Sequence, residues 1–225
     1  MGEAVGAMLA SAAGIAIGPR PLIAAILMLA ARRGRANALA LTVGRAAALG
    51  AIVAVVVAVV VTAGSRPAPG GEPTWPSWLK LALGTLLVLL ALGQWRDRPR
   101  EGHVNAPPGW MRSVRRFTAG RSARLGAALA AASPKDVVLA VGGAASVAAS
   151  PTSDAGKAVA GTLMVLIASL CTLLPLAVHL LGGDGSARTL GEWKAWMSAH
   201  HTAITTTVLA VLGTTYLGDA LTGLA

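Results

Sequence analysis

Charged residues are scarce in this sequence, and their scarcity argues against a soluble globular fold. Only 12% of the 225 residues are charged, whereas 55% are hydrophobic, and the mean hydropathy is +0.66. A soluble domain of this length has too little interior to bury so many apolar side chains. Several apolar runs reach the roughly 20 residues that a helix needs to cross a hydrocarbon core of about 30 Å. The composition therefore predicts an all-α, polytopic membrane protein.

Residue patterns that carry covalent or metal chemistry are also missing. The single cysteine, Cys171, lies inside an apolar run, so the chain cannot form an internal disulfide. No spacing of ligating side chains matches a metal site, and neither a phosphate-binding loop nor a nucleophile elbow is present. We therefore expect no enzyme activity, no metal and no cofactor. The first 16 residues lack a basic leader, so no cleavable signal peptide is expected.

Negative charge is in short supply as well, which leaves a net charge of +10. Such a balance is often a sign of nucleic-acid binding, but no aromatic RNA-binding signature or zinc knuckle accompanies it. The basic residues instead gather in the connections between apolar runs, which is the pattern of cytoplasmic loops in membrane proteins. No nucleic-acid partner is expected.

Six membrane spans are expected. They cover residues 5–31, 39–63, 79–95, 125–149, 159–181 and 204–221. The first, third and fifth connections hold 13 lysines and arginines, whereas the opposite arrangement would leave only three in the cytoplasm. This asymmetry predicts that both termini face the outside.

Two connections have an amphipathic pattern. Residues 109–120 predict a basic interfacial helix on the inner leaflet. In residues 190–200, Trp193 and Trp196 share one helical face, close to His200 and His201. Such a face is typical of an aromatic anchor at the head-group level, and a lipid-contacting gate is the alternative.

Two spans are interrupted in the same way, by a small residue, a proline and a cation. The residues concerned are Gly18, Pro19, Arg20 and Pro21 in the first span, and Ser133, Pro134, Lys135 and Asp136 in the fourth. Each interruption opens a group of three spans, so the two groups have opposite orientations. This arrangement predicts two inverted three-helix repeats, at residues 1–95 and 125–225, joined by the basic connection 96–124.

The interruptions predict a binding site for an anion. Proline removes a backbone donor, and in lipid such a break persists only where protein or a wet cavity surrounds it. Half-helices that begin at these breaks present free N–H groups, to which Arg20 and Lys135 add full charges. Alternatively, both cations snorkel to an interface. Asp136 either neutralises a neighbouring cation or carries a proton during transport.

Three other residues have a simpler expected role. Arg45 lies early in the second span and is expected to be an inner-leaflet anchor. Pro175 is expected to kink the fifth span, and Asp219 is expected at the head-group level of the last.

The chain resembles the lysine-exporter (LysE) superfamily in the order and spacing of short motifs. Residues 18–21, the basic turn at residues 32–38 and the Ser-Pro-Lys step at residues 133–135 resemble motifs of that superfamily, although Ser133 stands where its members carry asparagine. The tail, with residues 196–201, 211–213 and 217–219, looks closest to the GAP branch, the glycolipid-, peptidoglycolipid- or sulfolipid-addressing proteins of actinobacteria. The resemblance covers essentially the whole chain.

This resemblance implies a transporter in the bacterial inner membrane. The expected function is export or flipping of an amphiphilic, anionic glycolipid or peptidolipid by alternating access, with Pro19, Arg20, Pro21, Pro134 and Lys135 at the substrate. An exporter of amino acids or small cations is one alternative, and a non-transporting scaffold for a lipid-synthesis or lipid-export machine is another. A homodimer is expected, because six slender helices make a thin wall around a large substrate.

Overall fold

The chain is described by a computed structural model over residues 2–31, 33–64, 75–96 and 117–224. Every regular element in these ranges is helical. The helices are α1 (Gly2–Ala16), α2 (Pro19–Leu29), α3 (Gly34–Gly64), α4 (Trp75–Arg96), α6 (Ala119–Ala131), α7 (Pro134–Ala149), α8 (Asp154–Ala168), α9 (Leu170–Leu181) and α10 (Ser186–Thr222), with a short 3-10 turn, η2 (Gly183–Gly185), before the last.

The helices are those of a multi-pass membrane protein. Three of them, α3, α4 and α10, are each long and apolar enough to cross a bilayer. The other six form three bent pairs, with bends of 47° between α1 and α2, 72° between α6 and α7, and 58° between α8 and α9. If each bent pair is one crossing, the total is six.

The observed helix ends differ from the predicted spans in two places. Helix α6 begins at Ala119, so residues 119–124 belong to the bundle and not to the connection before it. Helix α10 is continuous from Ser186, so the predicted amphipathic segment and the last span are one helix of 37 residues. Most of the predicted interfacial helix at residues 109–120 lies outside the described residues.

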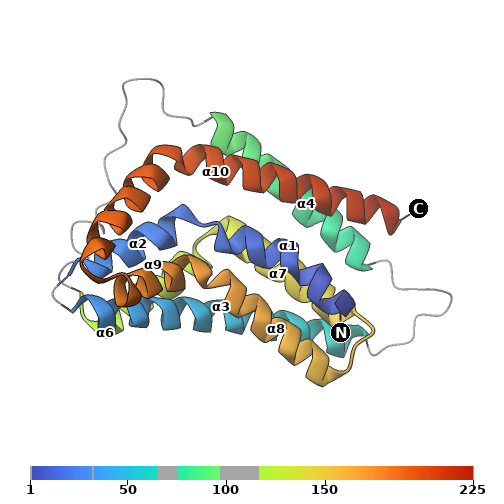
Figure 1. The fold of residues 1–225 in the computed structure, drawn as a ribbon. Coiled ribbons are helices and arrows are strands. Elements are labelled where there is room, and N and C mark those ends of the chain that lie inside the picture. Colours follow the sequence, from blue (N-terminus) through green and yellow to red (C-terminus); the bar gives the residue numbers. More distant parts are fainter. Residues whose placement is uncertain (1, 32, 65–74, 97–116, 225) are drawn as a thin grey trace.

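Among the described residues, the connections that were predicted to be basic lie together at one end of the bundle. Figure 1 shows the turn from α2 to α3, the start of α6 and the turn from α9 to α10 at its left-hand end, with both termini at the right-hand end. The first part of α10 packs against α2 and α9, and the remainder lies beside α4. The odd-numbered connections therefore share one end of the molecule.

Two hydrophobic clusters hold the helices together. The larger one joins α1, α3, α4, α7, α8 and α10 through side chains such as Met8, Leu139 and Leu212. The smaller one surrounds α2, where Met28 packs with Leu176 of α9 and further residues. Nearly all of α2 is buried, so this half-helix is an internal element of the bundle.

Helices α3 and α6 approach so closely that their contact requires glycine. A Cβ atom added at Gly44 would collide with the backbone carbonyl of Ala123, and one added at Gly126 would collide with that of Leu41. Small residues permit this approach in membrane proteins, where packing between backbones replaces the hydrophobic drive for association. The contact ties the second predicted span to the fourth.

Candidate functional site

The first helix break lies between α1 and α2 and follows from its two prolines. Gly18 is extended, with φ −113° and ψ 105°, and Pro19 takes the first position of α2. Proline suits that position because the first N–H groups of a helix have no partner within the helix. Pro21 removes another of these donors. The chain therefore changes direction by 47° inside the first span.

The second break, between α6 and α7, has the same construction with an added cap. Ser133 is extended, and its hydroxyl oxygen accepts a hydrogen bond of 3.4 Å from the backbone N–H of Asp136. Pro134 takes the first helical position. A serine at this place satisfies one of the free donors at the start of a helix. At both predicted interruptions, one helix thus ends and a second helix begins.

A buried ionic cluster lies at the second break. The Asp136 carboxylate contacts two cations, with Oδ2 2.9 Å from Nη2 of Arg45 and Oδ1 3.0 Å from Nζ of Lys135. The ammonium of Lys135 also donates a hydrogen bond of 2.6 Å to the carbonyl of Gly14, in the last turn of α1. Side-chain exposure is 0% for Arg45, 3% for Asp136 and 10% for Lys135.

The cluster carries one more positive than negative charge. Two cations meet a single carboxylate, and a buried ion costs several kcal/mol unless other groups compensate it. The C-terminal end of α1 supplies part of that compensation for Lys135, because a helix C-terminus carries partial negative charge. The buried Nε and Nη1 atoms of Arg45 meet no oxygen or nitrogen acceptor among the described residues, whereas the Cys171 thiol lies within hydrogen-bonding reach of the guanidinium. The Asp136 carboxylate is therefore the one anionic group recorded beside Arg45 in the described part of the chain.

A third break lies inside the predicted fifth span and reaches the same cluster. Helices α8 and α9 bend by 58° at Ser169, whose hydroxyl donates to the carbonyl of Val165. Thr172 donates likewise to the carbonyl of Ser169, and such bonds from serine and threonine side chains bend helices. Cys171, two residues after the bend, lies within electrostatic reach of Arg45, Lys135 and Asp136.

The fifth span is bent, as predicted, but the bend that the structure records lies at Ser169 and not at Pro175. That proline lies inside α9, six residues beyond the bend at Ser169. The hydroxyl groups of Ser169 and Thr172 were the signal in the sequence that marks the position of the bend.

Arg45 is not an inner-leaflet anchor, contrary to its predicted role. Its side chain is completely buried and paired with Asp136. The signal that it belonged to the site was a charge inside an apolar run, since an intramembrane charge requires a partner and Asp136 lies in a similar position.

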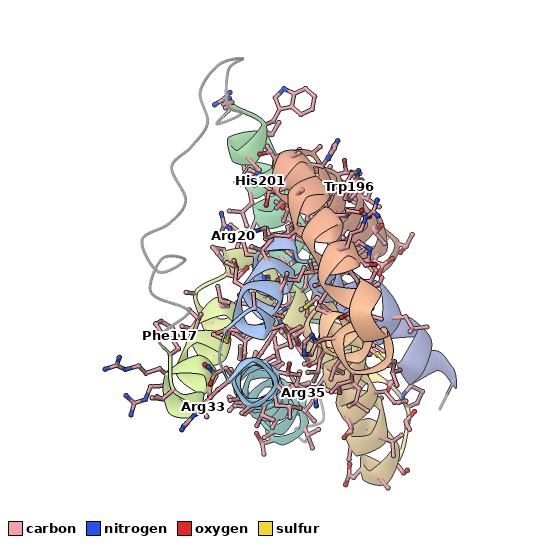
Figure 2. All side chains as sticks on the ribbon, turned by 60° about the vertical axis from the view of Figure 1, so that its left-hand side comes forward. Arg20, Arg33, Arg35, Phe117, Trp196 and His201 are labelled. Atoms are coloured by element: carbon pink, nitrogen blue, oxygen red, sulfur yellow. The ribbon has the colours of Figure 1, made fainter. Side chains whose placement is uncertain are left out.

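Arg20 does not join the cluster. Its side chain is exposed in the first turn of α2 and is labelled in Figure 2, whereas most other side chains of α2 are buried. From the helical rise, it lies about 14 Å from the far end of α2, which is near half the thickness of a hydrocarbon core. The structure thus places Lys135 and Asp136 in the cluster, and leaves Arg20 on an open surface near the break between α1 and α2.

The aromatic and histidine side chains of α10 lie at the outer surface of its first turns. Trp196 is 56% exposed and stacks on His200, with ring centroids 4.7 Å apart. Trp193 and Met197, on the neighbouring part of the same helical face, are half-buried and pack against the smaller hydrophobic cluster. His201 lies one residue further along, and Figure 2 labels it together with Trp196. This segment is far from the ionic cluster in sequence, and no contact between them is seen among the described residues.

A second buried polar contact joins the first and last helices. The hydroxyl groups of Ser11 in α1 and Tyr216 in α10 are 2.6 Å apart. Gly142 of α7 leaves room for the tyrosine ring, since a Cβ atom there would collide with it. Asp219 lies one turn further along and pairs with Lys80 at 3.1 Å on an exposed surface.

These features define a multi-pass membrane protein whose broken helices meet at a buried ionic cluster. The comparison with family models identifies its family: residues 8–222 match the model of Sap, the sulfolipid-1-addressing protein, and the chain belongs to that family. The resemblance to lipid-addressing proteins is thereby confirmed, and the family gives the chain a lipid-related role in the membrane. Neither a curated protein nor a solved structure matches the chain.

Proposed function

We propose that this protein exports an anionic, amphiphilic lipid across the bacterial inner membrane by alternating access. The observation that carries the proposal is the ionic cluster, in which Arg45 and Gly14 of the first half meet Lys135 and Asp136 of the second. A buried cluster with excess positive charge, between two groups of broken helices, is suited to interact with an anionic head group during transport.

The packing of the helices supports an inverted repeat. Half-helix α2 packs against α9 and α10, which belong to the last two spans, while α7 packs against α3 and α4, the corresponding spans of the first half. In the same reciprocal way, α1 packs against α8 and α6 packs against α3. Each broken span is thus held by the opposite half, as rocking of one repeat against the other requires.

Arg20 supports an anionic substrate. It is an exposed cation at the start of α2, at about the depth of the bilayer midplane. A charge at that depth is costly against lipid, and such residues almost always face a water-filled cavity or a substrate path. In this proposal Arg20 first attracts the head group, Lys135 and Arg45 lie on its route, and Asp136 balances them between transport steps.

The proposal also covers orientation and assembly. The basic connections face the cytoplasm and both termini face outward, as the positive-inside rule requires. The exposed Trp196 and His200, with the half-buried His201, form either an anchor or a gate at the inner leaflet. A homodimer, and contact with lipid-synthesis or export machinery, are further parts of the proposal.

The test is transport by the purified protein in vesicles that contain fluorescent phosphatidylglycerol. Wild type is expected to move the labelled lipid between leaflets, and Arg20→Ala is expected to slow this movement at least tenfold, because the site loses its accessible cation. Arg33→Ala is the matched control: it removes an exposed arginine of the turn before α3 and is expected to transport normally.

Two results would refute the proposed function. If wild type moves no lipid although it is folded and oriented, the scaffold alternative holds. If Arg20→Ala and Lys135→Ala together leave the rate unchanged, the substrate does not use this site.

A further inference from the structure

A groove runs between α3 and α8 on the outside of the bundle. It has a volume of about 550 Å³, within the usual range for ligand sites. Small residues such as Ala54 and Ala58 of α3 and Ala158 and Gly161 of α8 line it, so its wall is almost wholly apolar. Gly161 deepens it, since a Cβ atom there would meet Val53 at 3.2 Å.

The length of the groove matches one leaflet of a bilayer. Its lining on α3 extends from Gly50 to Val61. Eleven helical steps of 1.5 Å give about 16 Å, roughly half of a hydrocarbon core of about 30 Å. The outer end lies where α3 ends and α8 begins, at the end of the molecule that carries both termini (Figure 1).

The outer end of the groove has the charge that an anionic head group needs. Lys157 lines it, is half-buried, and has no ion pair that the structure records for the described residues. Asp154 also lines this end, but it is exposed in the first turn of α8, where a carboxylate interacts favourably with the helix N-terminus. A lysine at the rim of an apolar groove is a suitable partner for a phosphate or sulfate group.

The inner end of the groove approaches the ionic cluster. Gly50 is five residues from Arg45 on the same helix, which is about 8 Å along the axis. On the other wall, Val165 contacts the bend at Ser169, whose hydroxyl donates to its carbonyl. The inner end of the groove thus lies within about two helical turns of the place where the three broken spans meet.

From these observations we infer that the groove between α3 and α8 binds one acyl chain of an anionic membrane lipid whose head group contacts Lys157. One part of the inference rests on the proposed export function: the bound lipid is taken to be the transported substrate, held where it leaves the protein. Binding itself does not require transport and is measured without it.

The test is native mass spectrometry of the full-length protein in detergent, with phosphatidylglycerol or phosphatidylcholine of the same acyl chains added. Wild type is expected to retain one phosphatidylglycerol. Ala158→Trp fills the groove from an exposed position and is expected to weaken this binding at least tenfold. Val159→Trp is the matched control, because Val159 is 44% exposed on the same helix and does not line the groove.

A second variant tests the head group. Lys157→Ala is expected to reduce the preference for phosphatidylglycerol over phosphatidylcholine about fivefold, the effect of one lysine near a lipid surface. The inference is overturned if Ala158→Trp retains the lipid as wild type does, or if Lys157→Ala leaves the preference unchanged. It is also overturned if Ala158→Trp keeps the lipid but turns a dimer into monomers, because the groove is then an interface between two copies.

Discussion

Asp136 is the residue on which the ionic cluster depends. Its two carboxylate oxygens contact different cations, Arg45 from α3 and its own neighbour Lys135. Neither cation has another carboxylate partner that the structure records for the described residues. A buried ion that loses its partner is far more costly than an intact pair is beneficial. The single carboxylate therefore determines whether the meeting point of the helices is stable.

We predict that Asp136→Asn destabilises the protein by about 3–5 kcal/mol, because it leaves Arg45 and Lys135 as uncompensated buried charges. The measurement is the unfolding free energy of the purified protein in mixed micelles. The control is the double variant Arg45→Gln/Asp136→Asn, which removes one charge of each sign and is expected to lose less than the sum of the two single variants. An additive result would show that the two side chains are not coupled.

The residues of the ionic cluster could be predicted from the sequence only in part. Lys135 and Asp136 were identified because a cation and a carboxylate directly follow a proline inside an apolar run. Arg45 was misjudged because nothing in the local sequence reveals that α3 packs against α7 at that height. Ser11 and Tyr216 gave no signal, since their contact spans nearly the whole chain. The role of Arg20 as a substrate contact stays a prediction.

At the scale of elements, the closest contact in the bundle is the one between α3 and α6. Its glycines face backbone carbonyls of the opposite helix, which cannot move aside as a flexible side chain can. A small change in volume at this place therefore acts on the position of a whole helix.

Gly126→Ala is expected to destabilise the protein by about 1–3 kcal/mol, the usual range for an overpacked contact. Gly120→Ala provides the matched control on the same helix, because no atom lies within 4 Å of a Cβ at that position. That control is expected to be neutral or slightly stabilising, as alanine favours helix more than glycine does. Thermal unfolding midpoints of the two variants separate these effects; equal midpoints would contradict the close contact.

The sequence predicted the elements well where a helix breaker marks them. The breaks at Pro19 and Pro134 follow from the missing N–H group and the fixed backbone of proline. The bend at Ser169 has no proline at its position, so only the hydroxyl pattern signals it. No breaker lies between His200 and Ile204, which is why α10 continues through a predicted boundary.

At the scale of the whole molecule, the described connections are sorted by charge. Arg33 and Arg35 lie at the end that holds the turns between α2 and α3 and between α9 and α10, and both termini lie at the other. The even number of predicted crossings agrees with this arrangement. The assignment of the basic end to the cytoplasm rests on the positive-inside rule.

Cysteine labelling of intact cells tests the proposed orientation. We expect Thr222→Cys to react with a membrane-impermeant maleimide from outside, and Arg33→Cys to react only after the cells are permeabilised. Both positions are exposed, whereas the native Cys171 is buried and provides an unreactive background. The reverse pattern would place both termini in the cytoplasm and would invert the direction of transport proposed above.

The hydrogen bond from Lys135 to Gly14 has a mechanical consequence. It connects the first turn of α7 to the last turn of α1, and the ion pair between Asp136 and Arg45 connects α7 to α3. Helices from the N-terminal and C-terminal halves of the chain are thereby coupled at one place, which favours their moving together. In the export proposed above, the opening motion must therefore either pivot around these contacts, with α2, α9 and α10 moving past them, or break them as the anionic head group displaces the Asp136 carboxylate from Arg45.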